Sequence, residues 1–373
     1  MCKTVSKQIS ISGWNINGMY RRNNGANLYK MDDDSLNGVM KSDIVFLSET
    51  HLSYKDTLSH DGYESFLNCR SNESRKRRGG LAVFIKRSIL TGITLVDKSL
   101  SELMWFKMNS KFFGFEKDLF ICFLYITPSN STYVKKSGLD KQIFSKLDDN
   151  IVKYSNQGEI MLMGDLNAHI NCNEQDFIRN DSDSILDSFL PKNDIADSVQ
   201  IFRNTQVNQT TNSYVKSIIE LCNNSQLGIL NGRTIGDSVG KATYFNFNGV
   251  TINDYCICSA SFMKRVVNFQ VGSLYPLISD HCPITVNIFS KYKHSTPQEI
   301  LRPKPFNLKW TKIVEEQFIS NLNNIDLNSI SDKIVSFKQK SLDCSISVDD
   351  QSEDLNNIVE NFTGILKKCC IMH

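Results

Sequence analysis

The sequence lacks several features, and each absence argues against one class of protein. No apolar segment approaches the ~18 residues needed to cross a membrane, and the first residues, MCKTVSKQIS, contain no apolar signal region. The 42 lysines and arginines barely exceed the 40 acidic residues, which argues against a protein that binds nucleic acid through its overall charge. Binding of a polyanion would therefore require a local basic patch or a metal ion.

The 11 cysteines include no CxxC pair, the spacing that is typical of zinc sites and redox motifs. Cys256 and Cys258 lie in a strand-like segment, YCICS, so we expect them to fill the core rather than to bind metal. An odd number of cysteines without a signal region indicates reduced thiols. We therefore predict a nuclear or cytoplasmic protein that is not secreted and does not associate with a membrane.

Short apolar segments rich in Ile, Val and Phe recur over the first 290 residues and have the length of buried strands. Apolar residues at helical spacing appear between some of them, in residues 131–154 and 211–224. Strands mixed with helices over one long stretch predict an α/β fold with sheets inside and helices outside.

The end of the chain differs in composition, because three of the seven prolines fall within residues 297–305. Proline-rich segments of this kind are typical of linkers. We therefore predict an N-terminal tail over 1–7, a folded domain over 8–290, a proline-rich linker over 291–305 and a helical tail over 306–373.

Polar residues that can bind metal or transfer protons lie at the ends of several apolar segments. In layered α/β folds such strand ends meet at one edge, where ligands bind. Each residue alone has an ordinary explanation, such as turn chemistry for Asp-x-Asn or a structural pairing for Asp-His. Their recurrence along one chain favours a single polar site. The residues are Asn15, Glu49, Tyr125, Asp165, Asn167, Asp254, Asp280 and His281.

The motifs WNINGM, LSETHLS, RRGGLAVFIKRS, LYITPSN, MGDLNA, NDYCICS and ISDHCPI follow one another along the chain. Their order resembles that of the endonuclease/exonuclease/phosphatase superfamily. ETHL and LNGR further resemble the endonuclease domains of LINE-type (non-LTR) retrotransposon polyproteins. This resemblance implies a DNase I-like fold, a four-layered α/β sandwich in which two mixed β-sheets pack face to face with helices outside.

The resemblance also implies a metal site. Glu49 matches the metal-binding glutamate, and a carboxylate suits Mg²⁺, the expected cofactor, with Mn²⁺ as the alternative. Asn15 matches an asparagine that holds the phosphate or the metal shell, and Asp280 matches an acid near the metal. Tyr125 matches a tyrosine that contacts phosphate. His51, beside the glutamate motif, is expected to pack or to lie at the surface.

Cleavage of a phosphodiester requires an activated water and neutralisation of the charge that develops on the phosphate. By the same resemblance, Asp165 orients or deprotonates the water. The side chain of Asn167, on an extended backbone, would fix the Asp165 carboxylate and touch the phosphate. His281 matches a histidine that donates to a phosphate oxygen, and Asp254 matches the acid that orients it.

Two segments are candidates for contact with nucleic acid. Basic residues before the strand GGLAVFIK would contact the phosphate backbone, with a solvated loop as the alternative. The segment TYFNFNGVT begins with Thr243 and Tyr244, and its aromatic rings would wedge between bases or stack on them, with a plain hairpin turn as the alternative. The basic residues are Arg75, Lys76, Arg77 and Arg78.

We predict a Mg²⁺-dependent DNA endonuclease that nicks one strand and leaves 3′-hydroxyl and 5′-phosphate ends. In a full-length retroelement its partners would include a reverse transcriptase or element RNA, and residues 306–373 would be a truncated connector to that enzyme. One alternative is an abasic-site repair endonuclease, which is weakened because Thr251 replaces the tryptophan such enzymes carry. The others are a small-phosphoester phosphatase and a silent remnant that only binds nucleic acid.

Overall fold

A computed structural model of the chain describes residues 7–23, 26–70, 78–178 and 199–292, together with 316, 319–320, 328–341 and 357–359. The chain divides into two units, Met1–Pro297 and Gln298–His373, which are described separately. The described part of the second unit includes helix α7 (Asn328–Ser341). Most of the predicted linker lies outside the described residues, and the predicted domain boundaries stay predictions.

The first large sheet of the described residues has six strands in the order β15–β16–β1–β4–β6–β5. Strand β1 is antiparallel to β16 and parallel to β4, so the sheet is mixed. In the parallel pair Asn15 lies opposite Ser48, which places Asn15 and Glu49 at the same edge. The strands are β1 (Lys7–Asn15), β4 (Ile44–Ser48), β5 (Tyr63–Asn68), β6 (Leu81–Lys86), β15 (Val266–Val271) and β16 (Ile284–Ser290).

The second sheet has the order β11–β14–β10–β9–β8–β7 and is also mixed, because β10 is parallel to β9 and antiparallel to β14. Asp165, the last residue of β10, lies opposite Tyr125 on one side and opposite Asp254 on the other. Strand register alone therefore aligns three predicted site residues in one row. The strands are β7 (Ile93–Asp97), β8 (Leu103–Met108), β9 (Asp118–Tyr125), β10 (Gly158–Asp165), β11 (Leu227–Ile229) and β14 (Asp254–Ser259).

The two sheets pack face to face through one apolar core. Phe46 of the first sheet stacks on Phe123 of the second, with ring centroids 5.2 Å apart. Cys256 and Cys258 are fully buried in the same core, as their strand-like segment predicted. The inner strands of both sheets are buried on both faces, which explains why their segments are continuous apolar runs.

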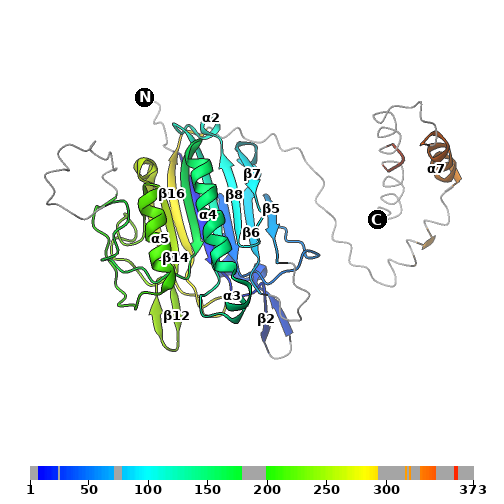
Figure 1. Ribbon diagram of the computed structural model, residues 1–373. Helices are drawn as coiled ribbons and strands as arrows, with labels where there is room; N and C mark the ends of the chain where they lie inside the picture. Colours follow the sequence, from blue (N-terminus) through cyan, green and yellow to red (C-terminus); the bar gives the residue numbers. More distant parts are fainter. Residues whose placement is uncertain are drawn as a thin grey trace, which may run out of the picture. The chain divides into compact units, whose positions relative to one another are not determined.

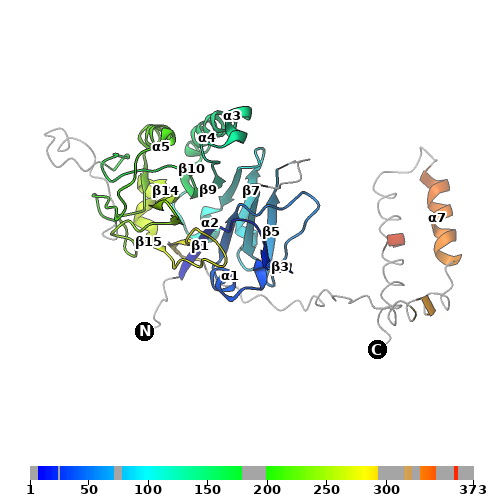
Figure 2. The same cartoon turned by 90° about the horizontal axis from the view of Figure 1, so that it is seen from below.

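Helices cover the outer faces of both sheets (Figure 2). Helices α4 (Leu139–Ser155) and α5 (Ser213–Asn224) pack on the second sheet, and α1 (Asp34–Val39) packs on the first. This arrangement confirms the predicted four-layered α/β sandwich. A buried stripe of residues four apart holds α4 in place. Burial of each of these side chains stabilises the folded state by about 1.5–3 kcal/mol relative to leaving it exposed. The stripe consists of Leu139, Ile143, Leu147 and Ile151.

The segment with helical spacing over residues 131–154 forms two helices. Helix α3 (Thr132–Ser137) ends at Gly138, whose φ of +60° lies in the left-handed region, and α4 begins at the next residue. Because glycine adopts this conformation without a steric penalty, the chain can end one helix there and start another.

Two hairpins project from the same end of the sandwich (Figure 1). One joins β2 (Tyr20–Asn23) to β3 (Ala26–Tyr29), and the other joins β12 (Tyr244–Asn246) to β13 (Gly249–Thr251). Among the described helices, none combines the length and the apolar character that a membrane span requires. The short elements that remain are α2 (Ser110–Phe113), η1 (Lys30–Asp32), η2 (Leu90–Gly92) and η4 (Ala260–Arg265).

Candidate active site

The predicted site residues meet at one pocket of about 440 Å³, at the edge where β1, β4 and β10 end. Tyr125 and Asp254 are buried and reach the pocket through hydrogen bonds to Glu49 and His281, which line it. The structure therefore brings the predicted catalytic and metal residues to one pocket, where they are joined by residues that the sequence analysis did not single out, such as Asn212 and Asn253. The lining residues are Asn15, Asn17, Glu49, Pro128, Ser129, Asn130, Asp165, Asn167, His169, Asn212, Tyr244, Asn253, Asp280 and His281.

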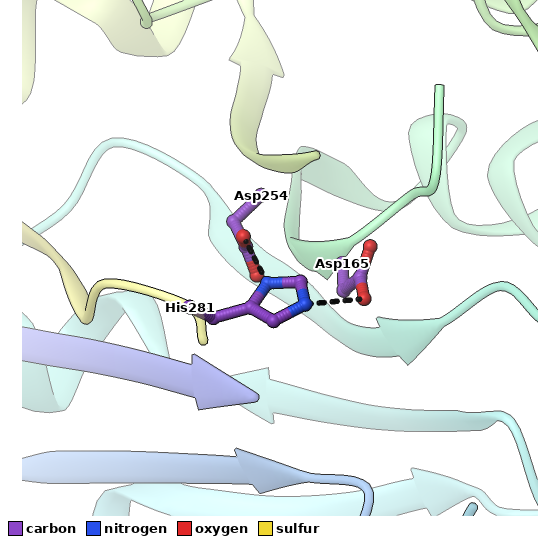
Figure 3. Close-up of side chains that lie close together, drawn as sticks. All are labelled: Asp165, Asp254 and His281. Atoms are coloured by element: carbon purple, nitrogen blue, oxygen red, sulfur yellow. Dashed lines mark hydrogen bonds and ion pairs between the residues drawn. The ribbon is translucent and has the colours of Figure 1, made fainter. Parts of the chain in front are cut away.

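Asp165, Asp254 and His281 form a buried cluster in which the imidazole ring stands between two carboxylates (Figure 3). His281 Nδ1 lies 2.7 Å from Asp254 Oδ2, and His281 Nε2 lies 3.9 Å from Asp165 Oδ2. A carboxylate near each ring nitrogen favours the doubly protonated, charged form of histidine.

Burial and neighbouring charges displace the pKa values in this cluster. Burial alone would lower the pKa of His281, but the charge and hydrogen bond of Asp254, with the charge of Asp165, raise it well above its ordinary value. Burial and the charge of Asp254 raise the pKa of Asp165, and the charge of His281 and a hydrogen bond from Asn15 oppose this only in part. Asp165 therefore takes up a proton far more readily than an exposed aspartate does.

Both carboxylate oxygens of Asp165 accept hydrogen bonds from predicted site residues. Asn15 Nδ2 donates to Oδ2, and the backbone amide of Asn167 donates to Oδ1, each at 2.9 Å. The expectation that the Asn167 side chain fixes this carboxylate from an extended backbone is wrong. The φ of Asn167 is +46°, so the chain turns, and Asn167 Nδ2 donates to the carbonyl of Ile126 at 2.8 Å. The Asn167 side chain therefore fixes the turn, and the turn presents the Asn167 backbone N–H to the Asp165 carboxylate.

Glu49 has a different set of partners. His51 Nε2 lies 3.3 Å from Glu49 Oε2, and the Tyr125 hydroxyl donates a hydrogen bond to the Glu49 carboxylate. Burial alone would raise the pKa of Glu49, but these hydrogen bonds, together with electrostatic attraction to His51 and His281, lower it to about 2. Glu49 is therefore ionised throughout the neutral range.

The backbone around Glu49 adopts a conformation that favours glycine, with φ of +51° at Glu49 and +55° at His51. A non-glycine residue in this region costs about 1–3 kcal/mol and persists only where its surroundings hold it. Here the amides of Thr50 and His51 donate to the carbonyls of Gly80 and Gly79 at 3.1 and 2.9 Å. The glycine pair of the RRGGLAVFIKRS motif thus holds the turn that presents Glu49.

His51 is a site residue that the sequence analysis did not anticipate, because it was expected to pack or to lie at the surface. Its ring instead contributes a hydrogen bond that keeps Glu49 ionised. The spacing Glu-x-His is the only sequence signal for this contact. The strained turn between the two residues, rather than the spacing itself, brings their side chains together.

The pocket offers the hard oxygen donors that Mg²⁺ prefers. Glu49 is ionised and lines the pocket together with Asn15 and Asp280, the other residues predicted to hold metal. The cluster around His281 also brings ligand atoms within 4.8 Å of one another. However, a charged imidazole carries protons on both nitrogens and cannot bind a cation. The donor set therefore fits a divalent cation at Glu49 and a proton network at His281.

Side chains that the sequence did not mark tie the site loops together. Lys30 Nζ donates to the carbonyls of Ile16 and Ile278 at 2.5 Å each, and Trp14 Nε1 donates to the carbonyl of His281 at 2.8 Å. Burial lowers the pKa of Lys30 to about 8. No sequence pattern identifies Lys30, because its three-dimensional neighbours come from opposite ends of the domain.

Thr243 and Tyr244, both predicted to contact nucleic acid, have different environments. Thr243 is fully buried, and its Oγ1 accepts hydrogen bonds from the amides of Asn253 and Asp254 at 2.9 and 3.0 Å. A side chain without exposed surface cannot touch DNA, so Thr243 supports the start of β14 instead of binding nucleic acid. Tyr244 lines the pocket, and its ring centroid lies 4.6 Å from that of His281.

The basic cluster before β6 is described only at its end. Arg75, Lys76 and Arg77 lie outside the described residues, and Arg78 is exposed. The predicted contact of this cluster with the phosphate backbone stays a prediction.

Two mixed sheets, with a pocket at their edge that is lined by carboxylates, amides and the buried His281, define a DNase I-like hydrolase fold. Residues 13–281 match the Endonuclease/Exonuclease/phosphatase family, and because this match covers more than half of the sequence, the chain belongs to that family. Members of this superfamily hydrolyse phosphoester bonds and generally use a divalent metal ion. No curated protein matches the chain.

Solved structures share the fold at low sequence identity. AP endonuclease LMAP from Leishmania major has a TM-score of 0.51 and 13% identity, over 76% of this chain and 88% of that one. The 3′ phosphatase NExo from Neisseria, bound to a product DNA hairpin, has a TM-score of 0.49 and 13% identity, over 75% and 99% of the two chains. The 3′-5′ exonuclease NExo from Neisseria meningitidis has a TM-score of 0.48 and 12% identity, over 75% and 100%. These likenesses concern the fold alone.

Proposed function

We propose that the protein is a Mg²⁺-dependent DNA endonuclease that nicks one strand and leaves 3′-hydroxyl and 5′-phosphate ends. The observation that supports this most is the contrast within one pocket between an ionised Glu49 and a proton-binding cluster of Asp165, Asp254 and His281. Hydrolysis of a phosphodiester needs a cation site and a proton acceptor in the same place.

Asp165 is the proposed proton acceptor. In the proposed reaction a water oxygen bonds to phosphorus, and Asp165 takes the proton that the water loses. The bond from phosphorus to the 3′ oxygen breaks, and this oxygen leaves with the bonding electron pair and takes up a proton from solvent to become the 3′-hydroxyl. A general base works best when its pKa is close to the working pH, and the raised pKa of Asp165 moves it in that direction. Hydrogen bonds from Asn15 and from the Asn167 amide aim its oxygens.

His281 is the proposed donor to a non-bridging phosphate oxygen. Its Nδ1 is committed to Asp254 at 2.7 Å, which keeps the ring charged and fixes its plane. Its Nε2 lies on the Asp165 side of the ring, and the side chain lines the pocket. A buried, pre-oriented positive charge stabilises a developing negative charge more strongly than an exposed one does.

Glu49, with Asn15 and Asp280, is the proposed Mg²⁺ site, and Mn²⁺ is expected to substitute. Bound metal would neutralise charge on the scissile phosphate and help the 3′ oxygen to leave. The Tyr125 hydroxyl already donates to Glu49, so its proposed contact with phosphate would be made from beside the metal site.

The lining of the pocket supports a polynucleotide substrate over a small phosphoester. A phosphatase for small, highly charged esters would be favoured by a lysine-rich pocket, and among the described residues that line this pocket there is no lysine or arginine. The hairpins at this end of the sandwich offer exposed aromatic rings, Tyr20 and Phe247, for contact with DNA beyond the pocket. The basic residues Arg75, Arg77 and Arg78 would contact the phosphate backbone.

The ETHL and LNGR motifs support an origin as the endonuclease of a LINE-type retrotransposon, acting in the nucleus or cytoplasm. In that setting the 3′-hydroxyl would prime synthesis by a reverse transcriptase, and residues 306–373 would form the connector towards that enzyme. Two buried side chains of LNGR hold the fold, since Asn231 donates to the carbonyl of Asp254 at 3.0 Å and Arg233 pairs with Asp176.

Plasmid nicking tests the proposal directly. With Mg²⁺ the protein is expected to convert supercoiled plasmid to relaxed circles that DNA ligase reseals without end treatment, and chelation of the metal should stop the reaction. Asp165→Asn and His281→Ala should each lower the rate about 10²–10⁴-fold, whereas Lys216→Ala, on the exposed surface of α5, should not. Intact supercoiled plasmid would exclude the endonuclease and favour the silent remnant. Circles that ligase cannot seal would contradict the predicted ends.

A further inference from the structure

A buried ion pair joins the two sheets close to Tyr125. Arg70, which follows β5, is 8% exposed, and Glu102, which precedes β8, is 2% exposed. Arg70 Nε lies 2.7 Å from Glu102 Oε1, and Arg70 Nη2 donates to Thr127 Oγ1 at 2.6 Å. The desolvation of two charges offsets much of their attraction, so a buried pair of this kind is weak evidence for a role in stability. Its geometry indicates a different role.

Both residues contact Tyr125, Arg70 through its side chain and Glu102 through its backbone. The Arg70 guanidinium carbon lies 5.9 Å from the Tyr125 ring centroid and 4.8 Å from that of Tyr133, so the cation borders two aromatic rings. The Glu102 carbonyl accepts the backbone amide of Tyr125 at 3.0 Å. The ring that borders the Arg70 cation is thus the one whose hydroxyl donates to Glu49.

Arg70 also packs against Gly79, which holds the turn that carries Glu49. A Cβ atom added to Gly79 would lie 2.7 Å from both the guanidinium carbon and Nε of Arg70, so any other residue at this position would force the Arg70 side chain to shift. The Gly79 carbonyl accepts the amide of His51 at 2.9 Å and so holds the strained turn of Glu49 and His51. One guanidinium thus supports Glu49 from two directions.

We propose that Arg70 is a positioning residue for the Glu49 carboxylate, acting through Tyr125 on one side and through Gly79 on the other. This rests on the proposed function, because Glu49 is the residue proposed to bind Mg²⁺. Arg70 itself touches neither metal nor DNA in this role. Loss of such a supporting partner lowers metal affinity or activity by about 10–100-fold in other metal sites.

The test replaces the whole pair, so that no unpaired buried charge remains to unfold the protein. Arg70→Met/Glu102→Leu is compared with Arg233→Met/Asp176→Leu, which removes another buried pair with 2% and 0% exposed side chains and an Nη2–Oδ1 distance of 3.1 Å. Mn²⁺ affinity, measured by electron paramagnetic resonance on the full chain, should fall about 10–100-fold in the first variant and stay within about twofold of the native value in the second. Arg70→Lys, which keeps the charge but loses the planar fork, should show a smaller loss.

A second readout reports on Tyr125 without metal or DNA. The protein is labelled with ¹³Cζ-tyrosine, and its Tyr125 nuclear magnetic resonance signal is assigned by comparison with Tyr125→Phe. This signal should shift in Arg70→Met/Glu102→Leu and in Arg70→Lys. It should not shift in the Arg233→Met/Asp176→Leu control. An unshifted signal, or a shifted signal with native Mn²⁺ affinity, would overturn the positioning role. If the native protein bound no Mn²⁺, the proposed metal-dependent function would fail, and the Tyr125 signal would still decide whether Arg70 positions this ring.

Discussion

Glu49 follows β4 of the first sheet and Asp165 ends β10 of the second, yet both carboxylates line one pocket. We call Glu49 with His51 and Tyr125 the Glu49 side, and Asp165 with Asp254 and His281 the Asp165 side. The pKa of Glu49 is lowered to about 2, and that of Asp165 is raised above its ordinary value.

Burial does not explain this difference, because burial raises the pKa on both sides. The partners explain it. Glu49 accepts hydrogen bonds from His51 and Tyr125, which stabilise its charged form, whereas Asp165 lies near a second carboxylate, Asp254, which opposes ionisation. When the pKa values of two acids in one site are shifted in opposite directions, one acid is suited to remain charged and the other to exchange a proton. The proposed division into metal ligand and general base follows from this contrast.

The sharpest way to break the contrast is to remove each charge in turn and to vary Mg²⁺. Asp165→Asn should lower the nicking rate about 10²–10⁴-fold at every Mg²⁺ concentration, because the lost group accepts a proton. Glu49→Gln should raise the Mg²⁺ concentration for half-maximal rate at least about tenfold, the effect of losing even an outer partner of a metal site. Nicking rates measured across a Mg²⁺ titration give both the maximal rate and the Mg²⁺ concentration for half-maximal rate. Gln142→Ala, on the outer helix α4, is the control. Rescue of Asp165→Asn by Mg²⁺ would reverse the proposed roles.

The two sides should also respond differently to pH. Below its raised pKa, Asp165 is protonated and cannot accept a proton, so the rate at saturating Mg²⁺ should fall about tenfold per pH unit on the acidic limb. Glu49 stays ionised down to about pH 2, so Mn²⁺ binding should persist at a mildly acidic pH where nicking is already lost. A pH series of single-turnover rates and Mn²⁺ binding isotherms separates the two. If the nicking rate and the Mn²⁺ affinity declined over the same pH range, the Glu49 side and the Asp165 side would titrate as one unit.

The fold was predictable because its signals are local and repeated. Short runs rich in Ile, Val and Phe become strands buried on both faces, and helical spacing marks the buried stripe of α4. The break at Gly138 was missed, because apolar spacing continues across it while the left-handed backbone there depends on one glycine. Periodicity reports which face is buried and is insensitive to a change of axis between two helices.

The sequence predicted part of the pocket lining but not the contacts that support it. Motif order pointed to Asn15, Glu49, Asp165 and His281, and all four line the pocket. Strand register accounts for Asn15 and Asp165, which end β1 and β10. Supporting contacts between residues distant in sequence were missed, as with Arg70 after β5 and Glu102 before β8, which are 32 residues apart. The backbone turn at Asn167 also decides which of its atoms contacts Asp165. The backbone N–H donates to the Asp165 carboxylate in place of the side chain that was predicted to do so.

Thr243 offers the mildest change and tests whether the two sides are independent. Its Oγ1 accepts the amides of Asn253 and Asp254, so Thr243→Val would leave two buried donors unpaired beside the Asp165 side. We expect the free energy of unfolding, measured in urea, to fall by about 1–3 kcal/mol, while Thr243→Ser keeps the acceptor and most of the stability.

The same Thr243 variant should leave the Glu49 side unchanged. Mn²⁺ affinity should stay native, and so should the salt dependence of DNA binding, because a fully buried side chain makes no contact with phosphate. A weaker salt dependence would restore the original prediction that Thr243 binds nucleic acid. A loss of Mn²⁺ affinity would mean that the start of β14 supports both carboxylates, and the two sides would then have to be treated as one structural unit.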